Sequence, residues 1–257
     1  MSGGHGHAHG LYLPGQTRLH RLPPECKVAA TLAFVLAVVA TPREAFWVFA
    51  VDAGLVLAIA RTGAVPLIKL LRRLSLEAPF VGFALFLPLV GDGRRIDVLG
   101  LSLSVAGLWG AWNILVKGTL GVAATVLLAS TTTVPELLRG LDRLHAPRAF
   151  TAVAGFMVRY SEVITGDMRR MRIARQSRAY DPRWLWQGRA LAASAGALFI
   201  RSYERGERVH LAMLSRGFTG GLPVIDDDRK PTARQWQQAA VVPVIAGLAA
   251  AIAWGLS

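Results

Sequence analysis

The sequence has few charged residues and a single cysteine. Charged residues make up 18% of its 257 positions, whereas about a quarter are charged in an ordinary soluble domain. The lone Cys26 excludes an internal disulfide and a zinc site built from cysteines. The chain also lacks the Gly-x-x-x-x-Gly-Lys-Ser/Thr phosphate-binding loop. We therefore expect no nucleotide hydrolysis, no enzyme activity and no bound cofactor.

Apolar residues, in contrast, are abundant and gathered in long runs. They make up 53% of the chain, and the mean hydropathy is +0.41. A helix that crosses the hydrocarbon core of a bilayer needs about 20 mostly apolar residues. We therefore predict an all-α, polytopic membrane protein with about five spans. The runs that predict these spans cover residues 26–41, 44–60, 77–90, 103–130 and 239–256.

Turn-forming and polar residues separate these runs. Pro42 disfavours helix at the residue before it, so the first two runs form a helical hairpin. Gly91-Asp92-Gly93 is typical of a turn after the third run. Lys117 lies inside the fourth run, which is therefore tilted, bent or made of two shorter pieces. A sixth candidate span, at 190–200, is short and has an arginine on either side.

Basic residues outnumber acidic ones by 29 to 16, which gives a formal net charge of +13. They lie between apolar segments rather than in a nucleic-acid-binding motif, so we expect no nucleic-acid partner. Loops rich in Lys and Arg remain in the cytoplasm. Arg18, Arg21 and Lys27 place the N-terminus there, as do the 15 arginines against six acids between 139 and 216. We predict a multi-pass protein of the cell (plasma) membrane with a cytoplasmic N-terminus.

The composition divides the chain into four parts. Residues 1–25 form a flexible cytoplasmic tail rich in His and Gly, 26–134 a membrane domain with four spans, 135–235 a cytoplasmic region, and 236–257 the last span. Within 135–235, apolar residues recur twice at three- and four-residue steps, which predicts two long amphipathic helices, the second at about 189–215.

Each predicted helix has an apolar stripe. We expect the stripes to pack the two helices against each other and against a partner, and the glycine in the second stripe to allow another helix close approach. Methionines in such stripes can bind soft metals, but adaptable packing is the interpretation we favour. The stripe residues to which we assign packing are Met157, Met168, Met171, Phe199, Tyr203, Gly206 and Met213.

Both helices end in similar tripeptides, Ser177-Arg178-Ala179 and Ser215-Arg216-Gly217, placed 38 residues apart. In one interpretation they are solvated helix ends, where a cation opposes the dipole and Gly217 supplies a left-handed cap. In the other, both arginines protrude and bind carboxylates on two copies of a soluble partner, because the guanidinium fork can hold a carboxylate through two hydrogen bonds.

Two long cytoplasmic helices that each end in an X-Arg-X motif resemble the coupling helices of the transmembrane T component of energy-coupling factor (ECF) transporters. The resemblance extends over nearly the whole chain and is nearest to the cobalt-type, or CbiQ, family. One departure is Ala179, where the family usually has Gly. The segments that carry the resemblance are Leu19–Lys27, Thr131–Leu138, Leu144–Pro147, Phe156–Tyr160, Ser202–Arg205 and Ala212–Phe218.

The resemblance implies a coupling subunit of an ATP-driven importer of cobalt ions, with nickel as the other candidate. Two ABC-type ATPase subunits, which bind the ATP, would dock on Ser177–Ala179 and Ser215–Gly217. Their closure would move the coupling helices and reorient a separate, metal-binding S-type membrane subunit. A small auxiliary membrane subunit is a further expected partner, together with the lipid bilayer.

Two other features allow alternatives. His5, His7 and His9 in the glycine-rich tail can bind Co, Ni or Zn, but we favour a tail without a metal function. Asp52 is a carboxylate well inside a predicted span, where ionisable residues are functional candidates. With Lys117 as its partner, Asp52 would suit an autonomous secondary transporter. A lipid-modifying enzyme is not supported, because the sequence has no histidine–carboxylate cluster at a membrane boundary.

Overall fold

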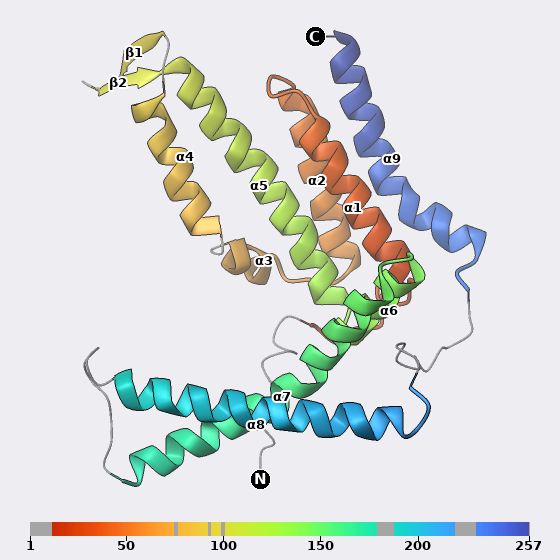
Figure 1. Cartoon of the computed structure of the whole chain (residues 1–257). Helices are drawn as coiled ribbons and strands as arrows, with labels where there is room; N and C mark the ends of the chain where they lie inside the picture. The colour runs from red at the N-terminus through yellow and green to blue at the C-terminus, as the bar shows by residue number, and fades with distance from the viewer. Residues whose placement is uncertain are drawn as a thin grey trace. The chain divides into compact units, whose positions relative to one another are not determined.

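The computed structural model describes residues 12–74, 77–91, 94–98, 101–178, 188–218 and 230–256. Helices dominate it, as the sequence predicts, and one short hairpin of strands interrupts them (Figure 1). The elements are α1 (Pro24–Ala40), α2 (Phe46–Thr62), α3 (Leu67–Leu74), α4 (Ala78–Val90), β1 (Arg95–Val98), β2 (Leu101–Ser104), α5 (Val105–Thr131), α6 (Val134–Arg143), α7 (Arg148–Gln176), α8 (Gly188–Leu214) and α9 (Ala233–Leu256).

The chain forms two compact units. Among the described residues, the bundle unit comprises those within 12–144 and 230–256, and the arm unit comprises those within 145–178 and 188–218. Helix α6, most of which falls in the predicted cytoplasmic region, is part of the bundle unit because it packs against α1. The arm unit contains the two long amphipathic helices α7 and α8.

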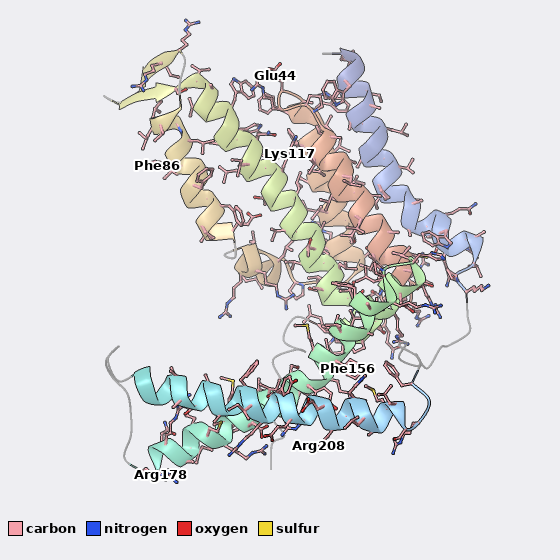
Figure 2. All side chains as sticks on the ribbon, in the orientation of Figure 1. Glu44, Phe86, Lys117, Phe156, Arg178 and Arg208 are labelled. Carbon is pink, nitrogen blue, oxygen red and sulfur yellow. The ribbon has the colours of Figure 1, made fainter. Side chains whose placement is uncertain are left out.

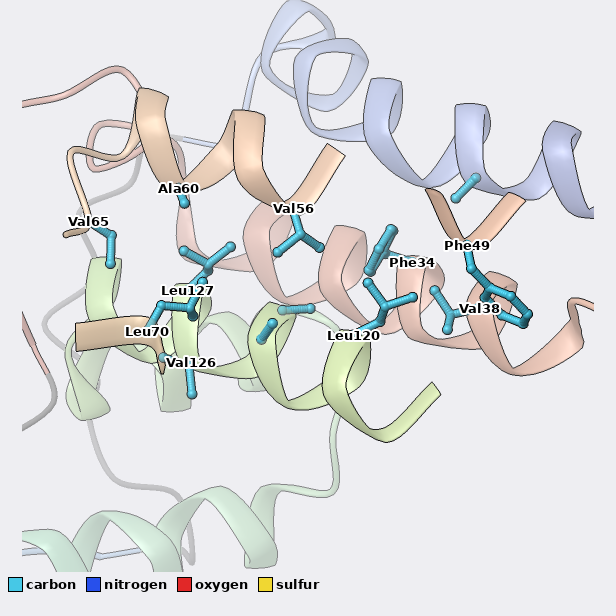
Figure 3. Packing of buried hydrophobic residues seen from close by; sticks show 13 residues of the cluster. Phe34, Val38, Phe49, Val56, Ala60, Val65, Leu70, Leu120, Val126 and Leu127 are labelled. Atoms are coloured by element: carbon cyan, nitrogen blue, oxygen red, sulfur yellow. The ribbon is translucent and has the colours of Figure 1, made fainter. Parts of the chain in front are cut away.

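The core of the bundle unit lies among α1, α2 and α5, with α9 packed along α1. Phe34 and Val38 of α1, Val56 of α2, and Leu120 and Leu127 of α5 meet there (Figure 3). Each of these five side chains is at most 6% exposed. Tight packing of this kind holds helices together inside a membrane, where lipid is as apolar as the side chains themselves.

The hairpin at Pro42 has the predicted form. Helix α1 ends at Ala40 and α2 begins at Phe46. The hydroxyl of Thr41 donates to the carbonyl of Ala37 at 3.0 Å, which satisfies one of the last acceptors of α1. The fourth apolar run, which contains Lys117, forms the single continuous helix α5 rather than two pieces.

The hairpin β1–β2 was not predicted from the sequence. The strands pair antiparallel, with Arg95 opposite Ser104 and Val98 opposite Leu101. Apolar residues alternate with polar ones in Arg-Ile-Asp-Val and in Leu-Ser-Leu-Ser, which is the period of a strand. The second half of β2 falls within the fourth apolar run because the strand leads directly into α5.

The bundle unit has the exterior of a membrane protein. Apolar side chains such as Leu36 and Leu85 are about 70% exposed, at 69% and 73%. Helices α5 and α9 are each long and apolar enough to cross a bilayer, and α4 is a shorter apolar helix. Trp236 and Trp254 of α9 lie 18 residues apart, which is about 27 Å along a helix and close to the ~30 Å hydrocarbon core. Tryptophan is enriched at both boundaries of that core.

A cluster of aromatic residues marks one end of the bundle. The ring of Phe46 lies 5.8 Å from that of Trp109 and 5.3 Å from that of Trp112. At the same end, the indole N–H of Trp254 donates to the carbonyl of Ala40 at 2.7 Å. Figure 1 shows the α1–α2 turn, the β1–β2 hairpin and the C-terminal end of α9 there, and α3 and the start of α1 at the opposite end.

Candidate functional site

The described residues of the arm unit form two helices that cross (Figure 1). Arg205 of α8 donates from Nη1 and Nη2 to Oδ2 of Asp167 on α7, both at 3.1 Å. Arg170 donates to the other oxygen of this carboxylate. These hydrogen bonds hold the pKa of Asp167 below its usual range, and the bond from Arg170 has the largest effect. Arg175 adds a second link between the helices by donating to Ser194 Oγ at 3.1 Å.

The Asp167–Arg205 pair occupies equivalent places in the two helices. Asp167 lies eleven residues before Arg178, and Arg205 lies eleven residues before Arg216. Eleven residues correspond to about 16 Å of helix. The C-terminal ends of α7 and α8 lie on opposite sides of the crossing, and Figure 2 labels Arg178 at the first of them. The crossing therefore carries two arms of equal length, each ending in one of the two motif arginines.

The first motif continues the last turn of α7. The backbone N–H of Ser177 donates to the carbonyl of Ile173 at 2.9 Å, and that of Arg178 donates to Arg175 at 3.1 Å. Arg178 is exposed. Ala179 lies outside the described residues, so its departure from the family pattern stays a sequence observation.

The second motif ends α8 with the predicted left-handed cap. Gly217 has a φ of +80°. The N–H of Phe218 donates to the carbonyl of Met213, and that of Gly217 to Leu214, both at 3.0 Å. This is the hydrogen-bond pattern of a Schellman motif, which favours glycine because a Cβ is strained at positive φ. Ser215 and Arg216 are exposed just before this cap.

Most of the stripe residues are exposed, so their packing role stays a prediction. Met157, Met168, Phe199 and Tyr203 are 69%, 54%, 72% and 60% exposed, respectively. Gly206 is exposed too, and a Cβ built on it meets no described atom within 4 Å. Met171 and Met213 are half-buried. Two half-buried residues of α8, Ser194 and Arg205, bond to α7. The other half-buried residues between 191 and 214 are Ala197, Leu198, Ser202, Val209 and Met213.

A basic groove with a volume of about 410 Å³ lies between α7 and α8 at the Arg178 end of the crossing. Arginine supplies half of the side chains that line it. The lining residues are Asp167, Arg170, Met171, Ala174, Arg175, Arg178, Ser194 and Arg201. Sequence reasoning missed this groove and the crossing pair, although counting back an equal number of residues from each motif arginine finds opposite charges at 167 and 205.

In the bundle unit, two of the resembling segments meet. Lys27 Nζ donates to the carbonyl of Thr131 at 3.0 Å and to Thr132 Oγ1 at 3.3 Å, which fastens the start of α1 to the end of α5. Glu25, 2% exposed, accepts from Arg143 of α6 at 2.9 Å. These contacts fix α6, whose C-terminal end leads along the chain toward α7.

Helix α6 is also well capped and closely packed. Thr133 and Glu136 form a capping box, with the Thr133 N–H donating to Glu136 Oε2 at 2.8 Å and the Glu136 N–H donating to Thr133 Oγ1 at 3.4 Å. A Cβ added to Gly140 would stand 2.9 Å from the carbonyl carbon of Pro24, so the α6 backbone approaches the start of α1 closely.

Asp52 and Lys117 share no hydrogen bond or ion pair. Asp52 is fully buried, and neither of its carboxylate oxygens has a hydrogen-bond partner among the described residues. Lys117 Nζ donates to the carbonyl of Val39 at 2.7 Å. His5, His7 and His9 lie outside the described residues. Within the part of the chain that is described, no group of three or more His, Cys, Asp or Glu side chains could hold a metal ion.

Comparisons with known proteins agree with the resemblance. The family model of CbiQ, "Cobalt transport protein", matches residues 15–225. A relative from Listeria innocua, "Energy-coupling factor transporter transmembrane protein EcfT", is 25% identical over 82% of this chain and 84% of its own length. The EcfT protein of Bacillus selenitireducens is 27% identical over the same shares. A "Putative fused cobalt transport protein CbiMQ" from Methanocorpusculum labreanum is 25% identical over 57% of this chain and 26% of its own. The chain belongs to the CbiQ family of cobalt-type T components of ECF transporters.

Proposed function

We propose that this chain couples ATP hydrolysis on two ABC-type ATPase subunits to the import of cobalt or nickel ions through a separate S-type membrane subunit. One ATPase subunit docks at Ser177-Arg178-Ala179 and the other at Ser215-Arg216-Gly217. The observation that carries the proposal is the pair of exposed arginines, each eleven residues beyond the Asp167–Arg205 crossing. Two equal arms around one crossing suit subunits that approach and separate as a pair.

In this proposal the arms act as levers. An ATPase subunit that moves an arginine by a few ångströms transmits this displacement along the helix to the crossing, because a helix is stiff over three turns. The exposed apolar residues, among them Met157, Phe199 and Tyr203, would then carry the motion to the S-type subunit. A small auxiliary membrane subunit completes the proposed assembly.

We also propose the topology. Helices α1, α2, α4, α5 and α9 cross the membrane, and the N-terminus is cytoplasmic. The bundle end with the start of α1 and α3 is rich in basic residues, including Arg21, Lys27 and Arg72, which supports its placement in the cytoplasm. The aromatic end, at Trp109 and Trp254, then faces outward.

Co-purification and uptake test the proposal. The tagged chain, extracted from its native membrane in mild detergent, should bring down an ABC-type ATPase and a polytopic metal-binding subunit. The double variant Arg178→Ala/Arg216→Ala should insert normally but lose ATPase binding and ATP-driven cobalt uptake. The control variant Arg172→Ala/Arg208→Ala removes one exposed arginine from each helix outside the motifs. It should keep both ATPase binding and ATP-driven cobalt uptake. Full uptake by the motif double variant would contradict the proposal.

The carrier alternative has its own test. An autonomous transporter moves ions in liposomes without ATPase subunits, and Asp52→Asn would abolish that activity. We expect no transport by the chain alone, because Lys117 is engaged by the Val39 carbonyl rather than by Asp52.

A further inference from the structure

The two arms differ in charge although they are equal in length. The arm from Asp167 to Arg178 carries five arginines and one acid, whereas the equivalent arm from Arg205 to Arg216 carries three arginines and one acid. Arg201 of α8 also lines the groove beside the first arm. The first docking end is therefore the more basic of the two.

Of the four arginines that line the groove, three have no carboxylate partner among the described residues: Arg175, Arg178 and Arg201. Arg170 is paired with Asp167, which it shares with Arg205. Arg175 donates to a neutral hydroxyl, that of Ser194. Arg178 and Arg201 are exposed. Like charges held side by side in a groove raise the local positive potential, which attracts anions and speeds their association.

The chemistry of the lining selects the kind of anion. Met171 and Ala174 are the apolar members of the lining, and neither offers an extended wall for an acyl chain. A phospholipid would therefore find a place for its phosphate but none for its tails. Carboxylates on a protein surface need no such wall, and the arginine fork binds them with two parallel hydrogen bonds.

We propose that this arginine groove binds an acidic segment of the ATPase subunit that docks at Arg178, so that the two docking sites are unequal. The inference rests on the proposed function. The site at Arg178 is the tighter and more salt-sensitive one, because Arg175 and Arg201 add charge to it. The site at Arg216 depends on its single motif arginine and the local helix end.

The test separates the two sites with single-motif variants of the full chain in nanodiscs of zwitterionic lipid. In an Arg216→Ala background, in which the Arg178 site remains, Arg175→Gln/Arg201→Gln should weaken binding of the purified ATPase subunit about ten-fold and flatten its salt dependence. In an Arg178→Ala background the same pair should change binding less than two-fold. The matched control is Arg172→Gln/Arg208→Gln, which alters two exposed arginines outside the groove.

Each other outcome is decisive. Equal losses for the groove and control pairs, or no loss for either, would overturn the groove while leaving the motif arginines as docking residues. If the groove pair left ATPase binding intact but lowered the phosphatidylglycerol retained by the chain in native mass spectrometry, the groove would be a lipid site and the proposal wrong. A wild-type chain that binds no ATPase subunit would refute the proposed function and this inference with it.

Discussion

In the bundle unit Phe34 and Leu127 are each 3% exposed, whereas α7 and α8 bury no described side chain to that degree. The bundle is held by apolar packing, with buried core side chains from α1, α2, α3, α5 and α9. The arms are held by a few polar links, such as Asp167–Arg205 and Arg175–Ser194. The two units therefore differ in how their helices are held together: the bundle has a buried apolar core, and the described residues of the arm unit are at most half-buried.

The contrast is tested most strongly by removing one phenyl ring from each unit. Phe34→Ala should destabilise the bundle by about 2–4 kcal/mol, mainly through the cavity it leaves. Phe199→Ala should change stability by less than about 0.5 kcal/mol, because this ring is 72% exposed. Thermal unfolding in detergent measures both. A cost for Phe199→Ala similar to that for Phe34→Ala would show that the arms have a core of their own.

Ion pairs give the second comparison. Arg143→Ala leaves Glu25 buried without its partner and should lower the free energy of unfolding by about 2–3 kcal/mol. Breaking a fully buried ion pair costs ~3–5 kcal/mol, and the cost here is smaller because Arg143 is 29% exposed. Arg208 and Glu204 of α8 are 69% and 56% exposed and stand 3.9 Å apart, so Arg208→Ala should cost less than about 1 kcal/mol. Denaturant titration followed by tryptophan fluorescence distinguishes these values, and equal costs would contradict the difference between the units.

A glycine in each unit, Gly140 in the bundle and Gly206 in the arm unit, compares how closely the backbones pack. A Cβ at Gly140 would meet the α1 backbone at 2.9 Å, so Gly140→Ala should cost about 1–3 kcal/mol. A Cβ added to Gly206 would meet no described atom within 4 Å, so Gly206→Ala should leave stability unchanged or raise it by up to about 1 kcal/mol. The larger Gly206→Leu should remain folded. If it also keeps uptake, the exposed face of α8 at this residue does not touch a partner.

The sequence predicted what short-range chemistry determines. Pro42 ended the first helix, and Gly217 set the cap of α8, because each acts through its own backbone. The two motif arginines stand out in the sequence because the tripeptide occurs twice, and both lie exposed at helix ends, while their docking role stays a prediction. The β1–β2 hairpin was missed because each strand is four residues long and the second merges with an apolar helix.

The contact faces of the arms could not be read from apolar periodicity. Periodicity locates the apolar side of a helix but not which molecule covers it, and Phe199 and Tyr203 belong to a side that this chain leaves open. The crossing is made by one acid and one arginine 38 residues apart, Asp167 and Arg205, and no local pattern joins them. Long-range polar contacts of this kind follow from the fold rather than from the neighbouring sequence.

The smallest expected effect is a loosening of the α7–α8 crossing at acidic pH. Because Arg170 and Arg205 lower the pKa of Asp167, the folded state binds a proton less readily than the unfolded chain does, so the link stabilises the crossing at neutral pH. This contribution starts to decline as the pH falls below the ordinary aspartate pKa of about 3.9 and is lost as the pH passes the lower pKa of the folded state.

Spin labels, one on α7 and one on α8, should report a wider spread of distances in that acidic range. Asp167→Asn should show the wider spread already at neutral pH, whereas Glu204→Gln should not, because Glu204 pairs within α8. A crossing that stays equally narrow in all three proteins would mean that the half-buried residues around Leu198 and Val209, rather than the charge pair, hold the arms together.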